Sequence, residues 1–472
     1  MPGYWVMKML EQFFEPKAVA VIGASRKTDS AGYGVLKSLL MGGVFESDTN
    51  RPFKGKVFAI NPNAEDILGQ KCLKSVLDVP GIIDLAVIVV NSQIVPSVMK
   101  ECAAKKVKGV IIISAGFGEI GIEGKKREEE ILEIAAKAKI RIIGPNCLGI
   151  MRPSFNLNAS FGPCMPKDGN VAFFSQSGAL IDSVIDWSLE KNYGFSAVAS
   201  LGNSIDVRTT DFLMWAENDK NTKAIALYME GLKDGQRFMK VAKEVSKKKP
   251  IVILKSGRTQ TGMKAVGSHT GNLAGSYDIY KAAFRQCGLH IAEDMDELFE
   301  MAQTLAYQPA CKDNGIVIIT NGGGAGVLCA DHCEGMGVKL TELSKETVAV
   351  LDKSGKMHPA YSRRNPLDLV GDALHERYSI AIDTVLKQKD VNGIIVIQTL
   401  QTMTEPMLDA KAVLDAMKKY PNKPIITSYM GGKFSRKSVE LLEANHVPDF
   451  NNPYKSAIAM KALIERGKWL RG

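Results

Sequence analysis

A repeated order of short apolar runs, each followed by a Gly-, Asn- or Ser-rich turn and then a helical pattern, most constrains the fold. Ala18–Ile22 leads into Gly-Ala-Ser, Val171–Phe174 into Ser-Gln-Ser-Gly, and Ile316–Thr320 into Asn-Gly-Gly-Gly. Strands that alternate with helices predict parallel sheets. Runs that stay apolar without alternation, such as Leu85–Val90, agree with strands covered on both faces. The sequence therefore predicts an α/β fold.

The apolar runs fall into three groups, and 472 residues at about 150 per domain suggest three domains. We place them at residues 1–150, 151–310 and 311–472, with connectors near 152–169 and 308–314. The other expected strands are residues 57–60, 110–113, 141–143, 197–200, 224–228, 251–254, 393–397 and 424–429.

Composition narrows the function classes. The net charge of +9 is dispersed, and no zinc-finger or RNA-recognition pattern accompanies it, which argues against nucleic acid. No run approaches the roughly 18 apolar residues of a membrane span, and no signal peptide is recognised. Eight scattered cysteines fit reduced thiols and a cytoplasmic location. Cys329 and Cys333 would share a helix face, but buried thiols are common, so we predict no metal site.

The turn Gly23-Ala24-Ser25 is of the kind that binds a dinucleotide after a first strand. A full fingerprint needs more glycines and a carboxylate at the end of the second strand. The second strand ends here in Asn61-Pro62-Asn63, so NAD is disfavoured. Coenzyme A or another phosphate-bearing ligand remains compatible, and so does a plain structural turn.

Two further turns open helices. Neither serine in Ser175-Gln-Ser177-Gly178 stands in Gly-x-Ser-x-Gly, which argues against a hydrolase. Asn321 to Gly326 holds four glycines but no Gly-Lys-Ser/Thr, so it is not a P-loop. Both turns favour an anion bound at a helix N-terminus.

Residues 257–276 are rich in Gly, Ser and Thr and carry little apolar surface, which predicts a mobile loop. His269 stands at its centre, and a neutral imidazole nitrogen is a good phosphoryl acceptor. The other ring nitrogen needs a partner to fix its orientation. Glu230, just after the 224–228 strand, is the candidate, because parallel strands carry chemistry at their carboxyl ends.

Taken together, these motifs resemble the α subunits of ADP-forming acyl-CoA synthetases (acetate–CoA ligase, ADP-forming), relatives of succinyl-CoA synthetase. The resemblance covers nearly the whole chain. It is carried, in this order, by Val21–Ser25, Ala59–Asn63, Gly144–Gly149, Phe174–Gly178, Tyr228–Gly231, Gly257-Arg258, Ser268–Gly271, Asn321–Gly326, Asn365–Leu369 and Met430–Gly432.

The resemblance implies a Rossmann-like CoA-binding domain followed by two flavodoxin-like domains. It implies that acyl-CoA, ADP and phosphate interconvert with acid, ATP and CoA through an acyl phosphate and a phosphohistidine at His269, which Glu230 steadies. Two helix starts would flank the phosphoryl group: Ser177 and Gly178, and Gly323, Gly324, Ala325 and Gly326. The acyl group would lie near Asn146 and Ser177. CoA would lie along Gly23, Ala24, Ser25, Asn61, Pro62, Asn91, Ser92, Ser114, Ala115, Gly116 and Phe117.

The family binds ADP or ATP, with Mg²⁺, on an ATP-grasp module, and three α/β domains leave no room for one here. The resemblance therefore implies a separate ATP-grasp β subunit, in an α₂β₂ or similar complex. The other substrates would be CoA or acyl-CoA, phosphate and a small carboxylic acid. A CoA-binding regulatory or scaffold protein of the same fold, without phosphoryl transfer, is the alternative.

Overall fold

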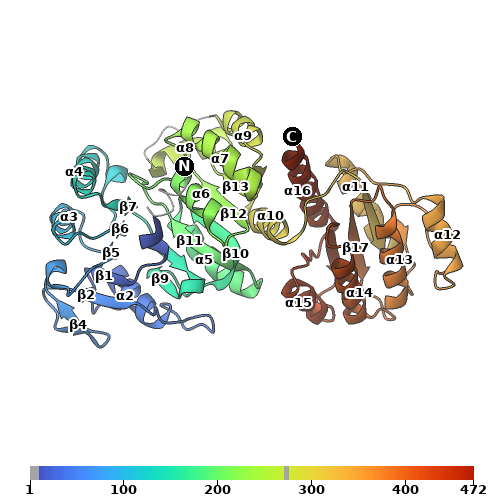
Figure 1. The fold of residues 1–472 in the computed structure, drawn as a ribbon, viewed down its shortest axis with the longest axis horizontal. Coiled ribbons are helices and arrows are strands. Elements are labelled where there is room, and N and C mark those ends of the chain that lie inside the picture. Colours follow the sequence, from blue (N-terminus) through green and yellow to red (C-terminus); the bar gives the residue numbers. More distant parts are fainter. Residues whose placement is uncertain (1–9, 271–275) are drawn as a thin grey trace. The chain divides into compact units, whose positions relative to one another are not determined.

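A computed structural model describes residues 10–270 and 276–472, with the side chains of 267–270 also left aside. The chain divides into two compact units, Met1–Glu293 and Asp294–Gly472 (Figure 1). The three-domain division at residues 150 and 310 stays a prediction. The α/β fold class is confirmed, since each unit alternates buried strands with helices.

The first sheet of unit 1 has the strand order β3-β4-β2-β1-β5-β6-β7. Apart from the antiparallel β3–β4 pair, neighbouring strands are parallel, and β4-β2-β1-β5-β6-β7 is the Rossmann order. The strands are β1 (Ala18–Ile22), β2 (Lys56–Ile60), β3 (Asp66–Ile67), β4 (Gln70–Leu73), β5 (Leu85–Ile88), β6 (Gly109–Ile112) and β7 (Arg141–Ile143). The helices are α2 (Ala31–Met41), α3 (Val95–Ala104) and α4 (Ile122–Ala138).

The second sheet of unit 1 has the order β14-β13-β12-β10-β11-β8-β9. Its parallel strands β11-β10-β12-β13-β14 follow the flavodoxin order 2-1-3-4-5. The strands are β8 (Gly149–Arg152), β9 (Leu157–Ser160), β10 (Lys167–Ser175), β11 (Gly194–Ser200), β12 (Ala224–Met229), β13 (Ile251–Lys255) and β14 (His290–Ile291). The helices are α5 (Gly178–Glu190), α6 (Thr209–Asn218), α7 (Gly235–Lys248), α8 (Gln260–Thr270) and α9 (Tyr277–Gln286).

Two sequence-based expectations are wrong in this sheet. The supposed connector 152–169 contains β9 and the start of β10, and β8 and β9 form an antiparallel hairpin beside β11. The supposed loop 257–276 contains α8. Thr259 begins this helix, because its Oγ1 accepts the backbone N–H of Gly262 at 3.1 Å. The small residues signalled a loop, but no residue from 259 to 266 is buried, so α8 needs little apolar surface.

Unit 2 contains one parallel sheet of order β16-β15-β17-β18, the flavodoxin order without its fifth strand. Its strands are β15 (Ile316–Thr320), β16 (Leu367–Asp368), β17 (Gly393–Thr399) and β18 (Ile425–Met430). Its helices are α10 (Met295–Tyr307), α11 (Gly323–Gly335), α12 (Lys345–Lys353), α13 (His375–Lys387), α14 (Pro406–Lys419), α15 (Arg436–Ala444) and α16 (Pro453–Arg471).

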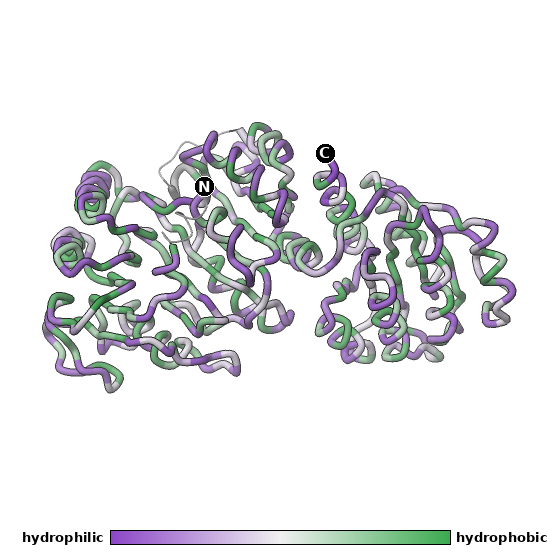
Figure 2. The backbone as a smooth tube through the Cα atoms, in the orientation of Figure 1, coloured by the Kyte–Doolittle hydropathy of each residue, from purple (hydrophilic) through white to green (hydrophobic). Residues whose placement is uncertain are grey.

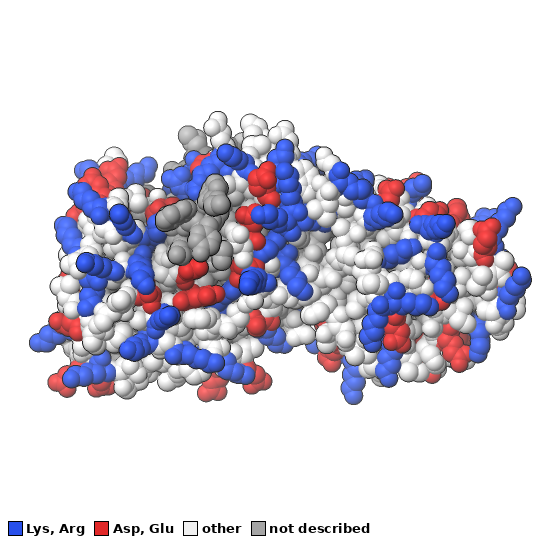
Figure 3. All heavy atoms as spheres, viewed as in Figure 1, with Lys and Arg blue, Asp and Glu red and all other residues white. Residues whose placement is uncertain are grey.

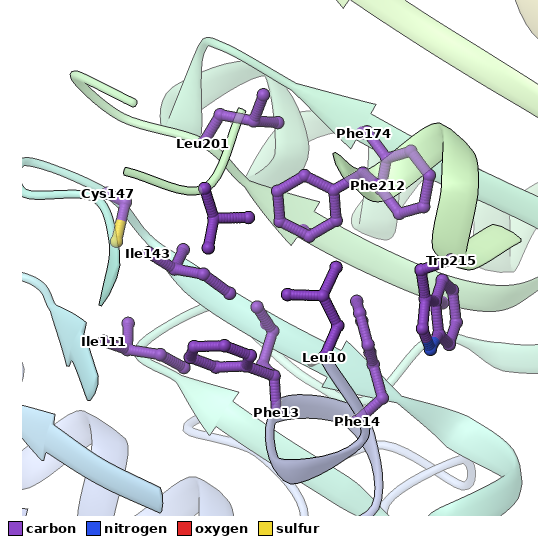
Figure 4. Packing of buried hydrophobic residues seen from close by; sticks show 14 of the residues in the cluster. Leu10, Phe13, Phe14, Ile111, Ile143, Cys147, Phe174, Leu201, Phe212 and Trp215 are labelled. Atoms are coloured by element: carbon purple, nitrogen blue, oxygen red, sulfur yellow. The ribbon is translucent and has the colours of Figure 1, made fainter. Parts of the chain in front are cut away.

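Apolar side chains from both sheets of unit 1 form one continuous core. Hydropathy along the chain follows the layers, with apolar strands and polar outer helix faces (Figure 2). The helical residues 10–14 contribute Leu10, Phe13 and Phe14, which point into this core (Figure 4). The Phe14 ring stacks on Trp215 of α6 at a centroid distance of 3.9 Å, and it meets Phe212 edge-on at 6.1 Å.

Replacing Phe14 by alanine tests this packing. Phe14→Ala should lower the free energy of unfolding of unit 1 by about 3–5 kcal/mol, because it removes a fully buried ring and leaves a cavity beside Trp215. Urea unfolding followed by circular dichroism measures the change. Phe45→Ala removes a ring that is 67% exposed and should change stability by less than about 0.5 kcal/mol. Equal losses in the two variants would contradict the role of Phe14.

Candidate functional site

The flavodoxin-like sheet of unit 1 changes direction of strand order at β10, between β11 and β12. Ligands of open α/β sheets bind in the crevice outside the carboxyl ends of the strands at such a point. The residues that follow β10 and β12 are Gln176, Ser177 and Glu230, and Ser175 is in register with Tyr228. The structure therefore brings predicted Ser177 and Glu230 to one crevice.

Gln176, which the sequence analysis did not assign, joins the two strand ends. Its Oε1 accepts the backbone N–H groups of Glu230 at 2.6 Å and Gly231 at 3.0 Å, and its Nε2 donates to the Gly231 carbonyl at 2.9 Å. Ser177 is the N-cap of α5 and its Oγ accepts the N–H of Leu180 at 3.4 Å. The position of Gln176 within a Ser-Gln-Ser-Gly helix start was the available signal.

A cavity of about 110 Å³ opens where the carboxyl ends of both unit 1 sheets meet. Glu230 lies at its wall and is 6% exposed. Lys233 also lines it, donating from Nζ to the Asn203 carbonyl at 2.9 Å, and burial lowers the pKa of Lys233. The lining also includes Gly118, Glu119, Lys125, Glu128, Asn146, Gln176, Gly202, Asn203, Ser204, Arg208, Thr209, Gly231, Leu232 and Asp234.

Asn146, the predicted acyl-site residue, meets Asn203 from the loop after β11. Asn146 Nδ2 donates to Asn203 Oδ1 at 3.4 Å, and the Asn203 N–H donates to the Pro145 carbonyl at 2.9 Å. Gly202 makes this approach possible, because its φ is +55° and a Cβ would stand 2.2 Å from the Pro145 oxygen. The two sheets thus share one wall of the cavity.

Two carboxylates bind the same amide. Asn203 Nδ2 donates to Glu119 Oε2 and to Glu128 Oε1, each at 2.7 Å. Burial by itself would raise the pKa of Glu119, but hydrogen bonds from Asn203 and from backbone N–H groups outweigh it, and the pKa lies below its usual value of 4.5. The sequence analysis did not identify Asn203, Glu119 or Glu128, because nothing in a sequence shows that a carboxylate contacts a loop far along the chain.

The same carboxylates accept hydrogen bonds from two residues predicted for CoA, Gly116 and Phe117, and from the neighbouring Gly118. Glu119 Oε1 accepts the N–H groups of Gly116 at 2.5 Å and Phe117 at 3.0 Å, and Glu128 Oε1 accepts that of Gly118 at 2.9 Å. Successive N–H groups that converge in this way form an anion-binding nest. Carboxylate oxygens fill this nest from within the chain.

The other predicted CoA residues follow neighbouring strands of the Rossmann-like sheet. Gly23 and Ala24 follow β1, and the amide of Asn61 after β2 donates to the Ala24 carbonyl at 2.8 Å. Gly23 has φ +92°, and a Cβ there would stand 2.2 Å from the Val89 oxygen. Ser25, Pro62, Asn91, Ser92, Ser114 and Ala115 lie in the same turns after β1, β2, β5 and β6. The sheet therefore gathers these positions along its carboxyl edge.

In unit 2, α11 begins at Gly323, directly after β15, as the glycine run predicts. Gly324 faces open space, while a Cβ on Gly323 would stand 2.8 Å from Asp368 Oδ2. Asn321 is 1% exposed and holds Thr399 of β17, accepting its N–H at 2.7 Å and donating to its carbonyl at 2.9 Å. Ala325 and Gly326 are buried in the first turn. The helix start is built as expected, and its role as an anion site stays a prediction.

His269 lies in the last turn of α8. Its side chain, with those of residues 267–270, lies outside the described part of the structure, as do residues 271–275. The contact between His269 and Glu230 stays a prediction. The base of the segment is described: Arg258 Nε donates to the Lys255 carbonyl at 3.2 Å, and Arg258 Nη2 to the Ala292 carbonyl at 2.9 Å.

Cys329 and Cys333 are both buried on α11, and His332 of the same helix packs edge-on to Tyr454. Across the described residues, no three His, Cys, Asp or Glu side chains are grouped as metal ligands would be. None of the described helices combines the length and apolarity of a membrane span. Basic and acidic side chains are interspersed on the face in Figure 3.

Family profiles match nearly the whole chain in three consecutive parts. Residues 17–153 match a CoA binding domain, residues 168–305 a succinyl-CoA ligase-like flavodoxin domain, and residues 316–472 a ligase-CoA domain. The chain is 42% identical over 469 residues to the acetate–CoA ligase [ADP-forming] II subunit alpha of Pyrococcus furiosus, covering 98% of this chain and 99% of that one. The chain belongs to the ADP-forming acetate–CoA ligase α-subunit family.

Two more relatives match nearly the whole of this chain. The acetate–CoA ligase [ADP-forming] of Methanocaldococcus jannaschii is 44% identical over 453 residues, and the match spans 95% of this chain but 62% of that longer protein. The dinucleotide-forming acetyl-coenzyme A synthetase 1 of Candidatus Korarchaeum cryptofilum, solved with phosphate and ADP, is 35% identical with a TM-score of 0.90 over 98% of each chain. The predicted family and its CoA-binding and flavodoxin-like domains are thus confirmed.

The Glu119 contacts predict a pH-dependent contribution to stability. Because the pKa of Glu119 is lowered in the fold, its contribution is present above about pH 4.5 and is lost as the pH falls through the lower folded value. Glu119→Gln should cost about 1 kcal/mol at pH 7, and this difference should shrink below pH 4.5, as measured by urea unfolding.

The matched control is Glu123→Gln. Glu123 is exposed and pairs with Lys126 at 2.8 Å on the surface, so its loss should have little effect at any pH. A Glu119→Gln difference that stays constant from pH 7 to pH 3 would show that the ionised carboxylate is not what stabilises this loop.

Proposed function

We propose that the chain is the catalytic α subunit of an ADP-forming acyl-CoA synthetase, with acetyl-CoA as the expected substrate. The observation that carries the proposal is that buried Glu230 and the N-terminus of α5 follow adjacent strands, β12 and β10, at the strand-order switch of a chain in this family. The carboxylate suits an imidazole partner, and the helix N-terminus suits a phosphoryl group. Both requirements of a phosphohistidine intermediate then meet in one crevice.

The proposed reaction proceeds in three balanced steps. Phosphate oxygen attacks the thioester carbonyl of acyl-CoA, the C–S bond breaks, and CoA leaves as the acyl phosphate forms. A ring nitrogen of His269 then attacks phosphorus, the P–O bond to the acyl group breaks, and the carboxylic acid leaves. ADP finally takes the phosphoryl group from His269 to give ATP. In each step, the bond that forms has a free energy of hydrolysis comparable to that of the bond that breaks. The sequence of steps is therefore reversible.

The residues of unit 1 divide the work in this proposal. CoA lies along the carboxyl edge of β1, β2, β5 and β6, and the acyl group lies by Asn146 and Ser177, in and beside the cavity. Gln176 fixes the peptide after Met229 and thereby orients Glu230. Glu230 accepts a hydrogen bond from the imidazole N–H that is not phosphorylated, which stabilises the charge that develops on the ring.

The helix start of α11 supplies a second set of N–H groups for the phosphoryl group when it moves away from the acyl site. Open space beside Gly324 supports this role, since an anion reaches these N–H groups without meeting a Cβ. The movement needs a carrier, and His269 lies at the far end of α8 from the strand that leads into it.

ADP, ATP and Mg²⁺ bind, in this proposal, on an ATP-grasp β subunit, in an α₂β₂ or related complex in the cytoplasm. The support is comparative: this chain spans 99% of a relative named as an α subunit, but 62% of a relative that carries no subunit designation. The remaining part of that longer relative is where a nucleotide module would lie.

Phosphoryl transfer to His269 is directly measurable. The purified chain, given acetyl-CoA and ³²P-phosphate, should acquire an acid-labile, base-stable label that mass spectrometry places on His269. His269→Ala should abolish the label, because alanine has no ring nitrogen to accept the phosphoryl group. His358→Asn, in unit 2, is the matched histidine control and should label normally.

Three outcomes would contradict this assignment. Label that persists in His269→Ala would place the acceptor elsewhere. Discharge of the label by ADP on the isolated chain, without a partner, would place the nucleotide site on this chain. A chain that binds CoA but never takes up label would favour the scaffold alternative.

Glu230→Gln separates binding from transfer. The amide keeps the size of the side chain but not the charge, so formation of phosphohistidine should fall by about 10²-fold or more, while CoA affinity measured by calorimetry stays unchanged. Gln176→Ala, which loosens the peptide that carries Glu230, should give a smaller loss. Normal labelling in Glu230→Gln would remove Glu230 from the mechanism.

A further inference from the structure

An open cavity of about 570 Å³ lies at the amino ends of β1 and β2, on the edge of the Rossmann-like sheet opposite the edge proposed for CoA. Its volume is within the range of small-molecule sites, roughly 300–1,000 Å³. Lys17, Lys54 and Lys56 line this amino-edge cavity, and none of the described residues in its lining is acidic. The proposed reaction makes no use of it.

The starts of two neighbouring strands bring the three lysines together. Lys17 directly precedes β1, and the Lys56 N–H donates to the Lys17 carbonyl at 2.9 Å where β2 begins. Gly55 allows this approach, because a Cβ there would stand 2.6 Å from the Lys17 oxygen and 2.5 Å from the Phe53 ring. Lys54 lies between that glycine and Phe53, which is buried. The backbone therefore holds three like charges around one space.

The lysines of the amino-edge cavity lack countercharges. None of their three ammonium groups has a hydrogen bond or an ion pair within the described part of the chain. Asp84 accepts the Lys17 backbone N–H at 2.9 Å, but its other oxygen binds Lys108 at 2.6 Å. Glu15, just upstream, lies 3.9 Å from Arg152. Gathered like charges repel one another, and a bound anion would remove that repulsion.

A second basic cavity of unit 1 differs in this respect. It has a volume of about 650 Å³ and lies at the amino ends of β6 and β7. Two of its cations are neutralised within the chain, since Lys108 pairs with Asp84 at 2.6 Å and Arg141 with Asp206 at 2.8 Å. The amino-edge cavity has no such pairs among the described residues, so its charge is available to a ligand.

The turn between β8 and β9 supplies the groups that could recognise a ring. Phe155 presents a side chain that is 36% exposed, and Phe53 supports it at a centroid distance of 6.2 Å. Asn156 follows, and its side-chain amide has no partner among the described residues. An aromatic ring stacks on a flat ligand, and a carboxamide both donates to and accepts from the edge of a heterocycle.

We propose that the amino-edge cavity binds a nucleoside di- or triphosphate, a ligand that joins a phosphate chain to a flat ring. Lys17, Lys54 and Lys56 bind the phosphate oxygens through charge-assisted hydrogen bonds. Phe155 stacks on the base, and the amide of Asn156 bonds its edge. Three lysines alone would suit any polyanion, and the ring and the amide are what favour a nucleotide. The inference goes beyond the proposed function and does not depend on it.

The test is a calorimetric titration of the full chain, without a partner subunit, with ATP in the absence of Mg²⁺. Lys54→Gln/Lys56→Gln removes two charges from exposed side chains, which should leave the fold intact. The matched control, Lys106→Gln/Lys139→Gln, removes two charges from the basic cavity at β6 and β7. Tripolyphosphate is the second probe, because it has the phosphate chain without the ring.

We expect Lys54→Gln/Lys56→Gln to weaken ATP binding about tenfold, because the two charges contact the phosphate chain. The control should stay within about twofold of wild type, since its lysines lie in another cavity. Phe155→Leu should weaken ATP binding about fivefold and leave tripolyphosphate binding unchanged, because only the nucleotide loses a stacking partner. Saturating CoA should not displace ATP, because CoA is proposed to bind the opposite edge of the sheet.

Four results overturn the inference: no ATP binding to wild type, equal ATP affinity in wild type and Lys54→Gln/Lys56→Gln, an equal loss in the control, or displacement of ATP by CoA. If Phe155→Leu leaves ATP binding unchanged and tripolyphosphate binds as tightly as ATP, the nucleotide assignment is wrong. The ³²P label should form at the wild-type rate in Lys54→Gln/Lys56→Gln. Absence of label in wild type would end the proposed function and leave this inference standing.

Discussion

The structure of unit 1 depends on the apolar core that its two sheets share. Leu10, Phe13 and Phe14 enter it from the first described helical residues, and Phe14 stacks on Trp215 of the second sheet. The hydrophobic effect does not by itself favour one orientation of the two sheets. The close packing of these side chains, however, resists movement of one sheet against the other. It holds the carboxyl edges of two sheets against one another. The cavity beside Glu230 exists because those two edges are fixed.

Much of the fold followed from sequence because buried parallel strands are read from apolar runs. β1, β7 and β15 begin and end where the runs do, and the helices α5 and α11 begin at the predicted serine and glycine turns. The hairpin of β8 and β9 was missed because its strands are short and contain polar buried residues such as Asn158 and Ser160. Helix α8 was missed because its small and polar residues carry little apolar surface, and because its N-cap, Thr259, was overlooked.

The residues of the candidate site likewise fall into those that the sequence could predict and those that it could not. Residues at strand ends, such as Glu230 and Ser177, could be predicted because topology alone brings them together. Gln176 and Asn203 could not, because their roles depend on which atoms face each other across loops and neighbouring strands.

The nest at Gly116, Phe117 and Gly118 would give the sheet edge proposed for CoA a particular thermodynamic character. Its N–H groups are bound by Glu119 and Glu128, which are tethered to the same loop and the following helix. A tethered group competes at an effective concentration on the order of millimolar or above. An anion that binds there gains only the difference between its own hydrogen bonds and those of a carboxylate. Anion binding at the nest would therefore exchange one anion for another, which favours ligands that make several contacts elsewhere and disfavours free phosphate.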